Sequence, residues 1–573
     1  MTGQGGGQAD VEDGRAVVSA AEVRADEMAA PPEDPRGART SVVVAGFTAL
    51  SRLSGVARVL TVGAVLGPTQ LGNAYQVTNS LPNLVWYGFL AGSLVPSVLV
   101  PMLVRQLDTA GPKRVAEVSR GFLGVATTAS LVLGPLAVIA LPLLLQLATL
   151  GVDAPSSARQ VDMVRLLVVL TVPQIFLYAV VGTAAAVMYS HGRFALPSVG
   201  PALENIGVIL VLVTSAFAFS DPAGAPGAPV AQLVLLGAGS TAAVGLNAAL
   251  QCWGAWRRGV TLFPTAGWRD PDIADVVRRA GRSVLTAGLF ASQTLLVVLL
   301  ASRVTGGVVA IQIALNFYAV AIALIATPVG LALLPQLSRL SQTADVASYR
   351  ETFLRGLTSA LFLAVPATVG YLLLAEPMAA VVSAGRMSSG AGEVMISGAL
   401  AALAIGLVGQ TITFTTTQAA YADGDVRTPF RCMRVQVLTC AVLCAGAVLL
   451  RDGPALVSAL ALAYALSVLV GGFVLLLQVV KGWSSVPSRL GTFGLRVGAG
   501  ALLMVGPVLA TSFLGRHLVA GRPGHLTAVV GGTVVGVIVF VLVQRLLKAP
   551  ELGWWSRGLR RRTPAAAPSA AAP

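Results

Sequence analysis

The sequence predicts an all-α polytopic membrane protein with about 14 transmembrane helices. A hydrocarbon core about 30 Å thick requires roughly 20 apolar residues per helix, because lipid offers no partner for an unpaired backbone N–H or C=O. Composition agrees, since 55% of the residues are hydrophobic, 11% are charged and the mean hydropathy is +0.79. The expected spans are 42–66, 80–104, 120–148, 162–189, 197–219, 229–251, 277–303, 308–335, 353–372, 394–421, 430–450, 455–480, 490–514 and 525–547.

The net charge of +14 lies mainly in the loops between these spans, where basic residues set orientation. No basic groove for nucleic acid could be assembled from such short loops, so nucleic acid is excluded as a partner. Most loop Arg and Lys residues share the side of the N-terminus, and we therefore expect both termini to be cytoplasmic. The other side carries fewer basic residues, namely Arg159, Arg165, Arg303, Arg386, Arg451, Arg516 and Arg522.

The two ends of the chain are predicted to be cytoplasmic tails. Residues 1–40 are hydrophilic and lack the apolar region of a signal peptide, so we expect them to be disordered. Residues 549–573 are basic and rich in Ala and Pro. There Trp554 and Trp555 precede several arginines, a pairing suited to an anionic membrane surface, although a solvated tail is an equally good interpretation. The Cys and His residues show no metal-ligand spacing, so neither a metal nor a cofactor is expected.

An internal repeat divides the spans into two bundles. The second span ends at residues 100–105 and the eighth at 334–339, and both follow the pattern x-P-x-L-x-R. Six spans separate the copies, an even number, so the halves run parallel and are related by an axis along the membrane normal. We therefore expect an N-terminal bundle over 41–251, a C-terminal bundle over 252–480 and a cavity between them.

Ionisable residues inside spans are the first candidates for this cavity. A charge in hydrocarbon costs roughly 2.5 kcal/mol or more, so it tends to face water, a partner or a substrate. Arg52 and Arg58 lie in the first span and Glu204 in the fifth. Six helical residues separate the two arginines by about 120°, so both face one cavity only if the helix bends at Ser54 and Gly55. The alternatives are snorkelling, or an Arg52–Glu204 pair that only holds two helices together.

Uncharged polar residues extend the list of candidates. They cluster around the second span and in the eighth, and many of them could instead form hydrogen bonds between helices, each contributing roughly 0.6 to 2 kcal/mol. The candidates for substrate binding among them are Asn73, Gln76, Asn79, Asn83, Gln312 and Asn316.

Five motifs, in order along the chain, resemble the MurJ/MviN family of lipid II flippases. The YADGDVRTP turn is the closest of them, and the order across fourteen spans makes the resemblance specific. The motifs are SRLSGVAR at 51–58, LPNL at 81–84 with Gly92 and Pro101, SHGRFALP at 190–197 with Asn205, LLPQLSR at 333–339 and YADGDVRTP at 421–429.

This resemblance implies two helical bundles around an inner cavity, with two additional transmembrane helices at 481–548. It also implies a bacterial plasma-membrane protein that moves the undecaprenyl-pyrophosphate-linked peptidoglycan precursor from the inner to the outer leaflet. Family members are thought to bind the pyrophosphate through cavity arginines, a role that would fall to Arg52 and Arg58 here. Guanidinium forks suit phosphate oxygens in a cavity of low dielectric constant.

The chain departs from the family at several cavity charges. Asn73 replaces a usual Asp, Trp86 and Ala91 lie where Arg and Glu are usual, and Asn316 stands in place of an Arg. The substrate is then gripped differently, with Trp86 contacting sugar or prenyl chain, or the protein handles another lipid-linked glycan.

We therefore expect a secondary transporter working by alternating access. No nucleotide-binding motif supports an ATP-driven pump, and the non-cytoplasmic loops offer no paired carboxylates or activated nucleophile for an enzyme. Its expected partners are the lipid-linked glycan, membrane lipids and cell-wall synthesis proteins. An exporter of drugs or cations is an alternative, but it would require an acidic cavity, to which only Glu204 contributes. A scaffold for cell-wall synthesis enzymes is a second alternative.

Overall fold

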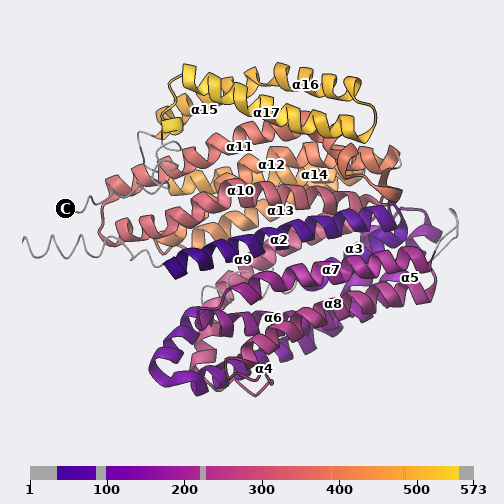
Figure 1. The fold of residues 1–573 in the computed structure, drawn as a ribbon, viewed down its shortest axis with the longest axis vertical. Coiled ribbons are helices and arrows are strands. Elements are labelled where there is room, and N and C mark those ends of the chain that lie inside the picture. The colour runs from indigo at the N-terminus through magenta and orange to yellow at the C-terminus, as the bar shows by residue number, and fades with distance from the viewer. Residues whose placement is uncertain are drawn as a thin grey trace, which may run out of the picture.

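The computed structural model describes residues 35–84, 99–219, 228–388, 390–481, 483 and 486–553, and these are helices joined by short turns (Figure 1). The predicted all-α membrane fold is confirmed. The helices are α2 (Pro35–Leu66), α3 (Gln70–Asn83), α4 (Val100–Ala148), α5 (Ala154–Thr171), α6 (Pro173–Ser190), α7 (Ala195–Ala218), α8 (Val230–Trp256), α9 (Pro271–Ala301), α10 (Gly307–Gln342), α11 (Val346–Val382), the 3₁₀ helix η3 (Gly385–Ser388), α12 (Gly390–Ala422), α13 (Arg427–Leu450), α14 (Gly453–Val479), α15 (Val486–Leu503), α16 (Val505–Leu518) and α17 (Arg522–Leu546).

Twelve stretches of the described chain are helical, long and apolar enough to cross a membrane, so this is a multi-pass membrane protein. Consecutive helices α5 and α6 form one such stretch, as do α15 and α16. The span expected at 277–303 corresponds to α9, in which Leu285–Ala301 is an apolar helical stretch of the described residues. The span expected at 80–104 lies partly outside the described residues.

The helix that leads into the second span begins ten residues before the expected start of that span, at Gln70 of α3. Thr69 caps this helix, because its hydroxyl accepts a hydrogen bond from the Gly72 N–H at 3.0 Å. The first turns of α3 are polar and face protein rather than lipid, so hydropathy alone places the start too late. Helix α4 also extends beyond the expected third span, because its arm after Gly111, whose φ is +80°, begins at Pro112.

The helices form two bundles and a C-terminal group (Figure 1). Helices α4 to α8 pack together on one side, and α10 to α14 pack on the other. Helix α2 packs mainly on α7 but also contacts α10, and the C-terminal helices α15 to α17 pack on α11. Residues Ile273 and Val276 of α9 join the core of the first bundle, whereas the other end of α9 contacts α13.

The two ends of the molecule differ in how the bundles meet. We call the end with turns 191–194, 257–270, 343–345 and 423–426 the Arg-rich end, and the end with turns 67–69, 149–153, 302–306 and 383–388 the opposite end. One hydrophobic core near the opposite end includes residues of both bundles. Toward the Arg-rich end each bundle has its own core instead. The bundles are therefore joined at the opposite end and separate toward the Arg-rich end.

Polar contacts seal the opposite end. The Asn73 side-chain amide donates to the Val304 carbonyl at 2.8 Å and accepts from the Val308 N–H at 3.1 Å. Arg303 donates to the carbonyls of Ala148 and Leu150, at 2.9 and 2.7 Å, near the end of α4. These bonds connect the α9–α10 turn to helices of the first bundle.

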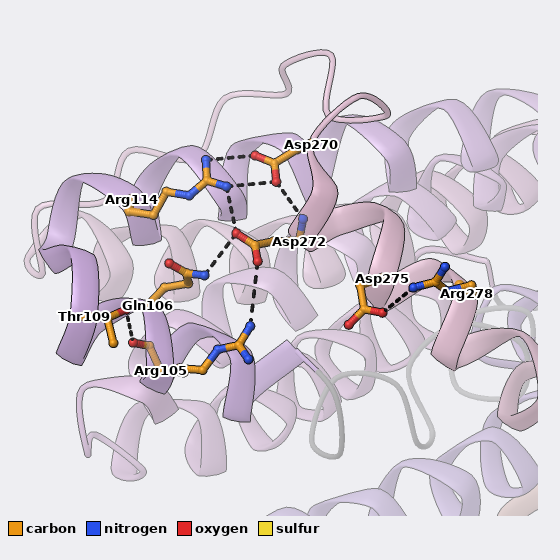
Figure 2. A network of polar contacts seen from close by, with 8 residues as sticks. All are labelled: Arg105, Gln106, Thr109, Arg114, Asp270, Asp272, Asp275 and Arg278. Atoms are coloured by element: carbon orange, nitrogen blue, oxygen red, sulfur yellow. Dashed lines mark hydrogen bonds and ion pairs between the residues drawn. The ribbon is translucent and has the colours of Figure 1, made fainter.

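At the Arg-rich end, a charge network fixes the start of α9 to α4 (Figure 2). Arg114 lies 2.9 Å from an oxygen of Asp270 and 2.8 Å from an oxygen of Asp272. Gln106 donates to Asp272 at 3.0 Å, and Arg105 lies 3.8 Å from the same carboxylate. The chain that connects the bundles therefore stays attached to the first bundle as far as the first turn of α9.

Candidate substrate cavity

A cavity of about 270 Å³ lies between the two bundles. Eight of the eleven described lining residues have polar side chains, among them one cation and several amides, and the contributing helices are α2, α3, α7, α9 and α10. The lining residues are Gly55, Arg58, Val59, Gln76, Asn79, Ser80, Leu84, Asn205, Thr294, Gln312 and Asn316.

Five of the candidates chosen from the sequence line this cavity together: Arg58, Gln76, Asn79, Gln312 and Asn316. Gln312 donates to the Ser80 hydroxyl at 3.0 Å, a hydrogen bond between α10 and α3 that crosses the cavity wall. The Asn316 amide donates to the Gln312 carbonyl at 2.9 Å.

Arg58 supplies the positive charge of the described cavity wall. Its Nη1 lies 3.7 Å from Glu204 Oε1 and donates to Asn205 Oδ1 at 3.3 Å. Its Nε and Nη2 have no hydrogen-bond partner among the described residues. The side chain is 15% exposed, so the guanidinium is largely desolvated yet keeps donors available to a ligand.

Glu204 lies behind Arg58 and does not line the cavity. Its carboxylate accepts hydrogen bonds from the Tyr178 hydroxyl at 2.7 Å and from the Asn247 amide at 3.0 Å. Gln251 donates to Asn247 at 3.3 Å and so extends the network along α8. The sequence could not identify these partners, because they lie 26 and 43 residues from Glu204 on other helices.

Arg52 does not join the cavity. Helix α2 is continuous from Pro35 to Leu66, and Arg58 but not Arg52 is among the lining residues. Arg52 is exposed, about 9 Å along the helix from Arg58 toward the Arg-rich end. The pair considered from the sequence, Arg52 with Glu204, is wrong, because Glu204 pairs with Arg58.

Three further residues that the sequence suggests for substrate binding are not among the described lining residues. Asn73 is fully buried and its amide is used in sealing the opposite end, so it does not line the cavity. Asn83 lies at the end of α3, but its side chain is not among the described ones. Trp86 lies outside the described residues.

Asn205, like Ser80 and Thr294, is a polar cavity residue that is absent from the candidates chosen from the sequence. Its amide donates to the Ser54 hydroxyl at 3.1 Å, and its carbonyl accepts from Arg58 at 3.3 Å. It therefore fixes the Arg58 side chain from α7. The signal was available, since Asn205 follows Glu204 directly and belongs to one of the five motifs.

A profile described as "Lipid II flippase MurJ" matches residues 62–544 of this chain. The chain belongs to the MurJ family. The protein named "Lipid II flippase MurJ" of Burkholderia cenocepacia is 24% identical over 400 residues, covering 69% of this chain and 75% of that protein. The "Probable lipid II flippase MurJ" of Rickettsia prowazekii is 22% identical over 403 residues, again covering 69% of this chain and 75% of that protein.

Solved structures agree on the MurJ fold. A lipid II flippase MurJ in an inward closed conformation superposes with a TM-score of 0.69 at 18% identity, covering 88% of this chain and 99% of that one. An inward-facing multidrug transporter of the MATE family, in the MOP superfamily, gives a TM-score of 0.60 at 12% identity, covering 80% and 98%. The resemblance inferred from the five motifs is therefore confirmed.

Proposed function

We propose that this MurJ family member flips a lipid II-like, undecaprenyl-pyrophosphate-linked cell-wall precursor from the inner to the outer leaflet. The observation that carries the proposal is the polar cavity between the bundles, where Arg58 keeps Nε and Nη2 available for phosphate oxygens. Gln76, Asn79, Gln312 and Asn316 add amide groups suited to the phosphates and sugar of such a lipid.

The transport cycle follows from the difference between the two ends. With the opposite end sealed and the bundles apart at the Arg-rich end, the substrate enters from the Arg-rich side and meets Arg58. Rocking of the bundles must then break the contacts of Asn73 and Arg303 to release it on the opposite side. Arg52, exposed on the same helix, attracts the anionic headgroup before it reaches Arg58.

A drug or cation exporter fits this cavity less well. Such a substrate requires an acidic wall, and Glu204 lies behind Arg58 and outside the lining residues. The scaffold alternative has no comparable support, because it gives no role to a polar cavity between two bundles. Cell-wall synthesis proteins remain proposed partners, as do membrane lipids around the apolar outer faces.

The proposed orientation places the Arg-rich end and both termini in the cytoplasm. Arg427 and Arg451 test it, because they are exposed at the two ends of the same helix, α13. In a functional background without the native cysteines, Arg451→Cys should react in whole cells with an impermeant thiol reagent. Arg427→Cys should react only after the membrane is opened. The reverse pattern would invert the orientation and the direction of transport.

Complementation tests the substrate. We expect weak rescue of a cell depleted of its own lipid II flippase, because charges usual in the family are missing and each charge-assisted contact is worth roughly 1.5 to 3 kcal/mol. Asn316→Arg adds a cation to the described cavity wall and should improve the rescue. Asn316→Gln is the matched control and should not. Trp86→Arg, at the second position where an Arg is usual in the family, should add to the gain.

The possible outcomes of this complementation test distinguish lipid II from other substrates. Full rescue by the natural sequence would show that the missing charges are dispensable. No rescue by the natural sequence or by the arginine variants, with normal membrane levels, would move the substrate to another lipid-linked glycan.

A further inference from the structure

We propose that Glu204 is a positioning residue that holds Arg58 in the empty cavity and competes with the substrate's phosphate for it. The inference rests on the proposed function and assigns a role within it. Glu204 would act as an internal anion, present before the substrate arrives and after it leaves. Its effect is to limit how tightly the cavity grips a pyrophosphate, so that the substrate can be released.

The contact between Arg58 and Glu204 is one in which a phosphate can replace Glu204 as the partner of the guanidinium. Arg58 Nη1 and Glu204 Oε1 are 3.7 Å apart, longer than a charge-assisted hydrogen bond of about 2.7 to 2.9 Å. The pair is monodentate, and Asn205 shares the same nitrogen at 3.3 Å. A phosphate that enters the cavity can therefore engage Nε and Nη2 first and draw the guanidinium away from Glu204.

Hydrogen bonds hold the Glu204 carboxylate in place when Arg58 turns away. Tyr178 and Asn247 donate to its two oxygens at 2.7 and 3.0 Å, from α6 and α8. Gln251 in turn fixes the Asn247 amide at 3.3 Å. These donors hold the carboxylate on the first bundle without help from Arg58, which removes much of the cost of leaving a buried charge unpaired.

A fixed carboxylate behind Arg58 has opposite effects on binding and release. It competes for the guanidinium and repels the incoming pyrophosphate through a poorly screened interior, so it weakens binding. For the same reason it speeds return of Arg58 and departure of the substrate. Removing the charge should therefore tighten binding and slow turnover. Loss of a purely structural residue would instead weaken binding and slow turnover.

The test uses full-length protein in proteoliposomes with purified lipid II as the probe. Glu204→Gln keeps the size of the side chain and removes its charge. We expect the half-saturating lipid II concentration to fall by roughly tenfold, with a several-fold lower maximal rate. Glu204→Asp, which keeps the charge, should lie closer to wild type. In an Arg58→Ala background, Glu204→Gln should change lipid II binding much less than in the wild type, because only the direct repulsion between the carboxylate and the pyrophosphate remains.

Tyr178→Phe provides a control of opposite sign. It removes the 2.7 Å hydrogen bond to Glu204 and leaves the charge in place, so the carboxylate depends more on Arg58. Lipid II binding should then weaken.

Each contrary result has a separate meaning. Unchanged half-saturation in Glu204→Gln, or a loss of both affinity and rate, would overturn the competition. Failure of the wild-type protein itself to bind or move lipid II would instead overturn the proposed function.

Discussion

Replacing Arg58 by alanine should abolish transport while the protein still accumulates in the membrane. Arg58 carries the positive charge of the described cavity wall, and its Nε and Nη2 have no hydrogen-bond partner among the described residues. Each lost charge-assisted hydrogen bond should cost roughly 1.5 to 3 kcal/mol, so affinity should fall by at least about tenfold. Lipid II transport in proteoliposomes, beside membrane abundance, measures both effects.

Two companion variants sharpen this prediction. Lysine at position 58 should restore only part of the activity, because an ammonium lacks the planar fork of the guanidinium. Arg52→Ala removes the same type of side chain from the same helix but outside the cavity lining, and it should reduce transport much less.

The effect of Arg58→Ala on membrane abundance can be separated from its effect on transport. If Arg58→Ala lowers abundance, the additional change Glu204→Gln should restore it by removing the stray buried charge. Normal transport by Arg58→Ala would show that Arg58 does not bind the substrate. Equal losses in the Arg52 and Arg58 variants would show that the cavity boundary is misplaced.

Adding one methyl group at Gly306 should prevent the opposite end from closing. A Cβ at this position would overlap the Cα of Pro68, so the α9–α10 turn and the turn after α2 can meet only if residue 306 is glycine. The backbone φ of +80° adds a further cost of roughly 1 to 2 kcal/mol for any other residue. Gly306→Ala should therefore lose most transport activity.

Gly453→Ala is the matched control. Gly453 lies at the same end with φ +58°, but a Cβ there has no heavy atom within 4 Å. It carries the backbone strain without the clash, so transport should be nearly retained. A cysteine at Asn79, in the cavity, should react faster from outside the cell in the Gly306 variant than in the wild type or in the Gly453 variant. If both alanine variants behave alike, backbone strain rather than contact between the two turns controls the seal.

Several features of the protein could be predicted from the sequence because they depend on local rules. Apolar length predicts the spans, and a charge inside a span predicts a site, as at Arg58. Hydropathy predicts a start for α3 that is too late, because the polar first turns of this helix face protein and hydropathy does not distinguish them from polar turns that face water. For the same reason Asn73 looked like a cavity residue, although its amide is used between the two bundles.

The contacts that organise the site depend on tertiary structure and could not be read from spacing. Tyr178 and Asn247 reach Glu204 from other helices, and neither position differs in type from ordinary polar residues in a span. The assignment of Arg52 depended on a bend at Gly55, a residue that permits bending but does not impose it. The unbroken α2 helix leaves Arg58 to line the cavity without Arg52.

Transfer of lipid II across a defined bilayer tests the central proposal most directly. Proteoliposomes that contain the purified protein and fluorescent lipid II would be treated with an impermeant quencher, which reaches only the outer leaflet. With the wild-type protein, the protected inner-leaflet fraction should decrease with time, and with Arg58→Ala it should stay as in protein-free vesicles. A protected fraction that stays constant with folded wild-type protein, or that decreases equally with Arg58→Ala, would contradict transport of lipid II through this cavity.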